Sequence, residues 1–148
     1  MIAMANSEAS RLVLRKDVAE LKRLAGWIEG FTQERTSPDV SFAVQLCLEE
    51  AVANIIMYGA RRDDPLEIAV ELERNGENLV ARIEDNGQQF DPTRAPPPVS
   101  ARSLEEAKVG ELGIHLMRSF ATGMDYERRD GRNRLTLRFV EPPLSAAE

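Results

Sequence analysis

The chain is poor in the residues on which most metal and nucleophilic sites depend. Among its 148 residues there is one cysteine, Cys47, and one histidine, His115. A lone cysteine forms no internal disulfide, and the pair is a poor supply for a zinc site or for Cys/His catalysis. Apolar runs stay far below the ~20 residues of a membrane span, and the N-terminus lacks the pattern of a signal peptide. We therefore expect a cytoplasmic protein with no membrane segment.

Positive charge is also scarce. The chain has 19 Lys and Arg against 25 Asp and Glu, a net charge of −6 and a pI near 5.0. This balance argues against nucleic-acid binding as the main activity and leaves room for a basic protein partner. With 43% hydrophobic and 30% charged residues, the composition is that of an ordinary soluble protein. We expect one domain over residues 1–148, with a core at about 11–140 and a tail at 141–148.

Hydrophobic periodicity predicts the element order β-α-α-β-β-loop-α-β-β. In the first half of the chain we expect a strand at 11–14, a helix from Asp17, a helix over 38–58, and strands at 66–73 and 79–85 joined by a hairpin turn at Asn75-Gly76. In the second half we expect a proline-containing loop at 94–108, a helix after Gly113, and a hairpin at 124–140 with its turn at Asp130-Gly131. Residues expected to face the core include Val18, Leu24, Ile28, Ile114, Met117 and Phe120. Because the strands come mostly as hairpins, we expect an α+β, two-layer sandwich with a mixed, mostly antiparallel sheet and helices on one face.

Two polar residues interrupt the apolar helix predicted over 38–58. Ser41, Gln45 and Glu49 form its polar stripe, and at about 100° per residue Glu50 and Asn54 both lie well away from that stripe. They are stacked as an i, i+4 pair. Burying such groups costs kilocalories unless they are bonded, so we expect either a partner such as Arg61 or Arg62, or a ligand.

A carboxylate continues the apolar face of the strand predicted over 79–85. Leu79, Ala81 and Ile83 share one face, and Asp85 has the same parity. Asp85 either caps the turn at Asn86-Gly87 or faces a pocket, where it would accept a hydrogen bond from an exocyclic amine such as that of adenine. Gly87 would then allow a flat ring to approach the backbone.

A glycine-bearing loop, Gly110 to Gly113, leads into the next predicted helix. A loop of this kind presents free N–H groups and the positive end of the helix dipole to an anion. Gly-x-x-Gly alone is a weak signal, because it also precedes helices that bind no phosphate.

Taken in order, these motifs resemble the N, G1 and G2 boxes of the Bergerat-fold (GHKL) ATPases, which include gyrase B, Hsp90, MutL and the histidine-kinase catalytic domain. The matching residues are Glu50 and Asn54 (E-x-x-x-N), Asp85, Gly87, Phe90 and Asp91 (D-x-G-x-x-F-D), and Gly110, Gly113 and Ile114. The stretches GIHLMRSF and YERRDGRNRLTLRF are closer to one branch, the anti-sigma-factor serine/threonine kinases of the SpoIIAB and RsbW type. The resemblance covers roughly residues 11–140.

The resemblance implies a histidine-kinase-like ATPase fold that binds ATP and Mg²⁺. Asn54 would hold the metal, Asp85 would accept the adenine amine with Gly87 beneath the ring, and Glu50 would be the general base on the attacking hydroxyl.

The remaining boxes imply a phosphate site. Gly110 and Gly113 would open a phosphate-binding lid over 94–108, with Phe90 and Ile114 in the same nucleotide-binding boxes. The sequence departs from the family at Glu111, which would bring negative charge near phosphates, and at Gln89 and Tyr58.

The resemblance therefore implies a kinase that phosphorylates an anti-sigma antagonist of the STAS type and sequesters a sigma factor. It also implies a homodimer, and the acidic charge fits a protein that binds a basic sigma factor and no nucleic acid. Two alternatives stay open. The first is a nucleotide-gated binding module with little kinase activity, motivated by Glu111. The second is a detached histidine-kinase-like ATPase domain, against which the absence of an adjoining His-bearing helical domain argues.

Overall fold

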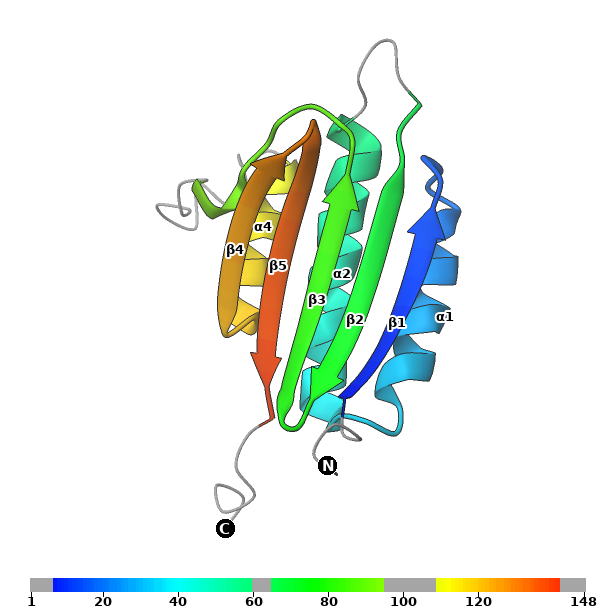
Figure 1. Cartoon of the computed structure of the whole chain (residues 1–148), viewed down its shortest axis with the longest axis vertical. Helices are drawn as coiled ribbons and strands as arrows, with labels where there is room; N and C mark the ends of the chain where they lie inside the picture. The colour runs from blue at the N-terminus through cyan, green and yellow to red at the C-terminus, as the bar shows by residue number, and fades with distance from the viewer. Residues whose placement is uncertain (1–6, 60–64, 95–108, 142–148) are drawn as a thin grey trace.

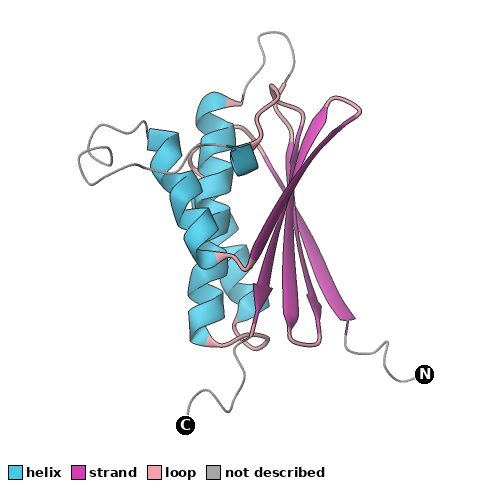
Figure 2. Cartoon of the chain, turned by 90° about the vertical axis from the view of Figure 1, so that its left-hand side faces the viewer, coloured by secondary structure: helices cyan, strands magenta, loops and turns pink. Residues whose placement is uncertain are grey.

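A computed structural model describes residues 7–59, 65–94 and 109–141, which form two layers. One layer is a five-stranded sheet (Figure 1), and Figure 2 shows the helices packed on a single face of it. The elements are β1 (Ser7–Leu14), α1 (Glu20–Thr32), α2 (Pro38–Tyr58), β2 (Ile68–Asn75), β3 (Asn78–Asp85), the short 3-10 helix η2 (Pro92–Arg94), α4 (Val109–Phe120), β4 (Gly123–Arg129) and β5 (Arg132–Val140). The predicted fold class and element order are confirmed.

The strands lie in the order β1-β2-β3-β5-β4, and every neighbouring pair is antiparallel. Both predicted hairpin turns are present. In the first turn Gly76 has a φ of 62°. In the second turn both central residues, Asp130 and Gly131, have positive φ values of 53° and 75°, as a type I′ turn requires. The central position of β3, between β2 and β5, places the end of β3 beside the start of β5 and beneath the helices.

The core lies between the sheet and α2, which runs along the middle of the helical layer. Ser37 caps the helix by accepting a hydrogen bond from the Val40 N–H at 3.3 Å, and Pro38 occupies the first turn. By length and composition alone α2 could cross a membrane, with a mean hydropathy of 1.5 over 18 residues. Here it is the central core helix, with eight buried residues: Val40, Ala43, Val44, Cys47, Leu48, Ala51, Val52 and Ile56.

The first helix begins later than predicted. α1 starts at Glu20, because the Asp17 carboxylate accepts the Ala19 N–H at 2.9 Å and Glu20 accepts the Arg15 N–H at 2.9 Å, which closes a turn ahead of the helix. The prediction that Val18 faces the core is wrong, since this turn leaves its side chain 63% exposed. At the end of α4, Phe120 is likewise 40% exposed, although Ile114 and Met117 are buried as predicted.

The sheet face opposite the helices is covered by ion pairs between neighbouring strands. Arg82 of β3 lies 3.0 Å from both Glu71 and Glu73 of β2, and Arg132 lies 2.9 Å from Glu67. The acidic side chains Glu67, Glu71 and Glu73 are therefore paired with arginines of the same chain.

Candidate functional site

The C-terminal half of α2 carries the two polar residues singled out in the sequence. Glu50 and Asn54 are half-buried. The Glu50 carboxylate lies directly against α4, where a Cβ built on Gly113 would be 2.4 Å from its Oε2. No hydrogen bond joins the Asn54 carboxamide to another described residue. Arg61 and Arg62, the predicted alternative partners, lie outside the described residues.

Asp85, the last residue of β3, is 4% exposed and faces the helical layer, as its parity predicts. Its Oδ1 accepts hydrogen bonds from the Gly87 N–H at 2.8 Å and from Asn133 Nδ2 at 3.0 Å. Burial raises the pKa of Asp85, and these two hydrogen bonds together with the nearby Arg128 oppose that rise. The carboxylate therefore both caps the turn and lies at the site, so the two alternatives for Asp85 are compatible.

Gly87 packs the loop after β3 against the C-terminal end of α2. A Cβ on Gly87 would lie 2.2 Å from the Gly59 carbonyl oxygen, and that oxygen also accepts the Gln88 N–H at 2.8 Å. The glycine is needed here for a close backbone contact. This contact brings Asp85 next to the last turn of α2, beyond Asn54.

The residues of the third motif are placed differently from the prediction. α4 begins at Val109, so Gly110 and Gly113 lie within the helix instead of in a loop before it. Ile114 is buried in the core, Phe90 is 51% exposed, and the expected lid lies outside the described residues apart from Arg94.

Sequence reasoning missed the buried Asn133, which is 6% exposed at the start of β5. Its carboxamide contacts Asp85, the loop after β3, and the side chains of Tyr126 and Arg128. A signal was present, because Asn133 has the same parity as the inward-facing Leu135, Leu137 and Phe139.

Cys47 takes no part in this chemistry. The thiol is fully buried, and burial raises its pKa to about 12, with a further contribution from Glu50. It is a core residue, and no thiolate nucleophile is available there. His115 is partly exposed.

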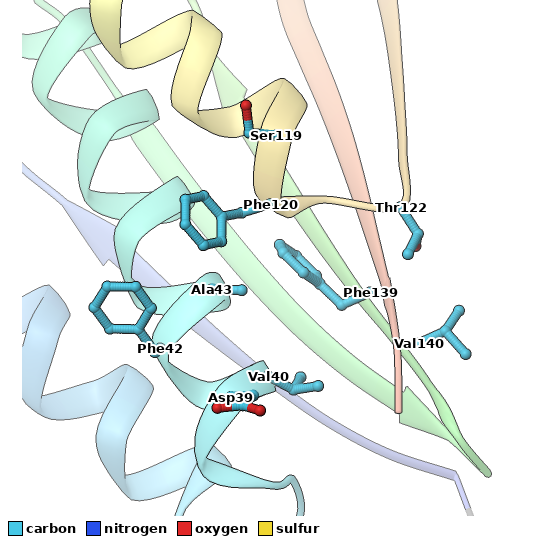
Figure 3. Close-up of a pocket in the computed structure, with 9 residues that line it drawn as sticks. All are labelled: Asp39, Val40, Phe42, Ala43, Ser119, Phe120, Thr122, Phe139 and Val140. Carbon is cyan, nitrogen blue, oxygen red and sulfur yellow. The ribbon is translucent and has the colours of Figure 1, made fainter. Parts of the chain in front are cut away.

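A separate hollow of about 270 Å³ lies at the other end of α2 and α4 (Figure 3). Phe42 and Phe120 meet edge to face across it, with ring centroids 5.9 Å apart. It shares no residue with the site around Glu50, Asn54 and Asp85, which occupies the end of α2 near Gly59.

Comparison with known proteins decides the family. Residues 14–139 match the histidine kinase-like ATPase domain. The chain belongs to this family. The predicted resemblance to the Bergerat-fold ATPases is thereby confirmed. The serine/threonine-protein kinase BtrW of Bordetella bronchiseptica is 38% identical over 120 residues, covering 80% of this ATPase-domain chain and 84% of BtrW. This match supports the serine/threonine kinase branch.

Solved structures agree on the fold of this histidine kinase-like ATPase domain. The histidine kinase domain from the Erythrobacter litoralis EL346 blue-light activated histidine kinase superimposes with a TM-score of 0.53. The sequences are 13% identical, and the match covers 88% of this chain and 67% of that one. At this identity the likeness establishes the architecture alone.

Proposed function

We propose that this protein is an ATP-dependent serine/threonine kinase that phosphorylates an anti-sigma antagonist of the STAS type and sequesters a sigma factor. The single observation that carries the proposal is the 38% identity to a serine/threonine-protein kinase over most of both chains. The site adds chemical support, because the C-terminal half of α2 carries a carboxylate and a carboxamide with no hydrogen bond to a described residue, and the loop after the buried Asp85 contacts the end of this helix.

In this proposal Glu50 accepts the proton of the substrate serine or threonine hydroxyl. The hydroxyl oxygen forms a bond to the γ-phosphorus of ATP, the bond to the β–γ bridging oxygen breaks, and ADP leaves with that electron pair. Phosphoryl transfer depends mainly on positioning and on charge neutralisation, so one well-placed base is sufficient for the proton.

Asn54 is suited to hold Mg²⁺, which when bound neutralises phosphate charge. Its carboxamide offers a hard oxygen ligand and makes no hydrogen bond to a described residue. Within the described ranges no group of three or more His, Cys, Asp or Glu side chains could hold a metal. This suits Mg²⁺, which commonly takes one or two protein ligands and completes its shell with phosphate oxygens and water.

Asp85 would recognise adenine in this proposal. Its Oδ1 is used by Gly87 and Asn133, and its Oδ2 makes no hydrogen bond to a described residue. We also propose that the kinase is a cytoplasmic homodimer. Its single buried thiol suits a reducing compartment, and its acidic charge suits a basic sigma factor.

The decisive experiment has two steps. Mg²⁺-ATP should raise the thermal unfolding midpoint of the protein, and no rise at millimolar nucleotide would contradict the nucleotide site. Labelled ATP is then supplied with candidate STAS-type proteins. Transfer of label to a serine or threonine supports the kinase, and Glu50→Ala should abolish transfer while nucleotide binding is largely kept.

A nucleotide-gated binding module is the second candidate, because Glu111 lies in the first turn of α4, at the end where phosphates would approach. The same two steps separate the candidates. Nucleotide stabilisation without transfer to any candidate would favour the binding module, and a gain of transfer in Glu111→Gly would attribute the missing activity to Glu111.

A further inference from the structure

Asn133 uses all of its hydrogen-bonding capacity on the candidate nucleotide site. Its Nδ2 donates to Asp85 Oδ1 at 3.0 Å and to the Gln88 carbonyl at 2.9 Å. Its Oδ1 accepts from the Phe90 N–H at 3.3 Å, the Tyr126 hydroxyl at 2.5 Å and Arg128 Nη1 at 3.1 Å. One buried carboxamide therefore joins β4, β5, the end of β3 and the loop that follows β3.

This network fixes the orientation of the Asp85 carboxylate. Asn133 and the Gly87 N–H both donate to Oδ1, so rotation of the carboxylate would break two hydrogen bonds in a buried setting. Oδ2 makes no hydrogen bond to the described residues, and no fully buried polar side-chain atom among them is left without a partner. Since both donors bind Oδ1, Oδ2 is the oxygen that would accept from a ligand in the proposed site.

Donors on Oδ1 also favour the ionised form of Asp85 against the burial that disfavours it. Arg128 adds positive charge, and it is held in place by Asn133 Oδ1 and by the Gly87 carbonyl at 3.0 Å. An ionised carboxylate only accepts hydrogen bonds, whereas a protonated one also donates.

We propose that Asn133 is a positioning residue that sets the purine specificity of this site. By holding Asp85 so that an acceptor-only oxygen faces the ligand, it favours the exocyclic amine of adenine and rejects the carbonyl that guanine carries at the same place. The inference rests on the proposed nucleotide site and deepens it, because Asn133 itself touches no base. A site built to bond one polar group discriminates strongly against the analogue that lacks it.

Asn133→Asp is the sharpest test, because it keeps the shape and the acceptor Oδ1 but replaces the donor that faces Asp85. Two carboxylates would then share a proton, and protonated Asp85 can donate to the guanine carbonyl. The dissociation constants of ADP and GDP are measured by calorimetry over about pH 5 to 8. We expect the preference for ADP over GDP to fall about tenfold or more and to become pH-dependent.

Tyr126→Phe is the matched control. It removes one donor to Asn133 Oδ1 and leaves both donors to Asp85 in place, so the ADP preference should be unchanged. Thermal unfolding checks that each variant folds. If Asn133→Asp does not fold, Asn133→Ala is measured instead, and a tenfold loss of preference is expected again.

The outcomes are distinguishable. If the unaltered protein binds no adenine nucleotide, the proposed function fails and this inference with it. If it prefers ADP and the Asn133 variants weaken ADP and GDP by the same factor, Asn133 is merely structural and the inference alone is overturned.

Discussion

The contact between Glu50 and Gly113 makes the predicted base sensitive to one methyl group. In Gly113→Ala the new Cβ would lie 2.4 Å from Glu50 Oε2 and 3.2 Å from its Cδ. Ordinary contact between such atoms needs about 3.5 Å, so the carboxylate must retreat by roughly 1 Å. A misplacement of about 1 Å in a catalytic group can reduce the rate ~100-fold. We expect a loss of phosphotransfer of that order.

Stability should change little in this variant. Alanine favours a helix over glycine by up to ~1 kcal/mol, whereas moving Glu50 off its rotamer costs about 0.5–1.5 kcal/mol. The two effects nearly cancel, so the thermal midpoint and the ADP affinity should stay close to those of the unaltered protein. Gly26→Ala is the control, since a Cβ there meets nothing within 4 Å; it should stabilise α1 and leave the rate unchanged.

Three measurements test whether Gly113→Ala acts by displacing Glu50: the rate of phosphotransfer, the ADP dissociation constant and the unfolding midpoint. A double-mutant cycle with Glu50→Ala isolates the mechanism, because Gly113→Ala should have no further effect on the rate once the carboxylate is gone. An undiminished rate in Gly113→Ala, or a rate loss that persists in full in the Glu50→Ala background, would refute the reasoning.

Three further predictions concern the rest of the site. Asn54→Ala should weaken ADP binding in Mg²⁺ and leave it unchanged in EDTA; equal weakening in both by calorimetry would remove the metal role. Gly87→Ala should lower the free energy of unfolding by ~1–3 kcal/mol, because its Cβ meets the Gly59 carbonyl at 2.2 Å; denaturant titration measures this, with Gly30→Ala, whose Cβ meets nothing, as control. The raised pKa of Asp85 means that the folded protein binds the proton more tightly than the unfolded chain, so stability from this group is lost as pH rises from its ordinary value through the raised one. ADP affinity should instead rise over that window, and Asp85→Asn should abolish both trends in thermal and binding titrations between about pH 4 and 7.

The fold was predictable because its elements are set by local patterns. Period-two alternation fixed the inward faces of β2 and β3, and Asn75-Gly76 and Asp130-Gly131 fixed the two hairpins that make the sheet antiparallel. Helix starts were less predictable, because a carboxylate near the start can accept a hydrogen bond within a turn that precedes the helix. Asp17 bonds within a turn, and α1 therefore starts at Glu20.

The site was predictable where one element alone determines the direction of a side chain. Parity placed Asp85 on the inner face of β3, and helical geometry placed Glu50 and Asn54 together away from the polar stripe of α2. The clearance that Gly113 gives Glu50 and the contact of Gly87 with Gly59 depend on how separate elements pack. No spacing within a single segment encodes such contacts.

Buried polar groups show most directly where a ligand belongs. Of the described residues, three polar side chains are buried: Thr32, Asp85 and Asn133. Thr32 is satisfied by the Ile28 carbonyl and by Ser41, at 2.9 and 2.7 Å, and Asn133 is fully used by its five hydrogen bonds. Asp85 alone keeps an oxygen with no partner among these residues. Burying a carboxylate costs stability, and the proposed adenine site gives this residue a reason to be there, because the exocyclic amine would supply a donor to that oxygen.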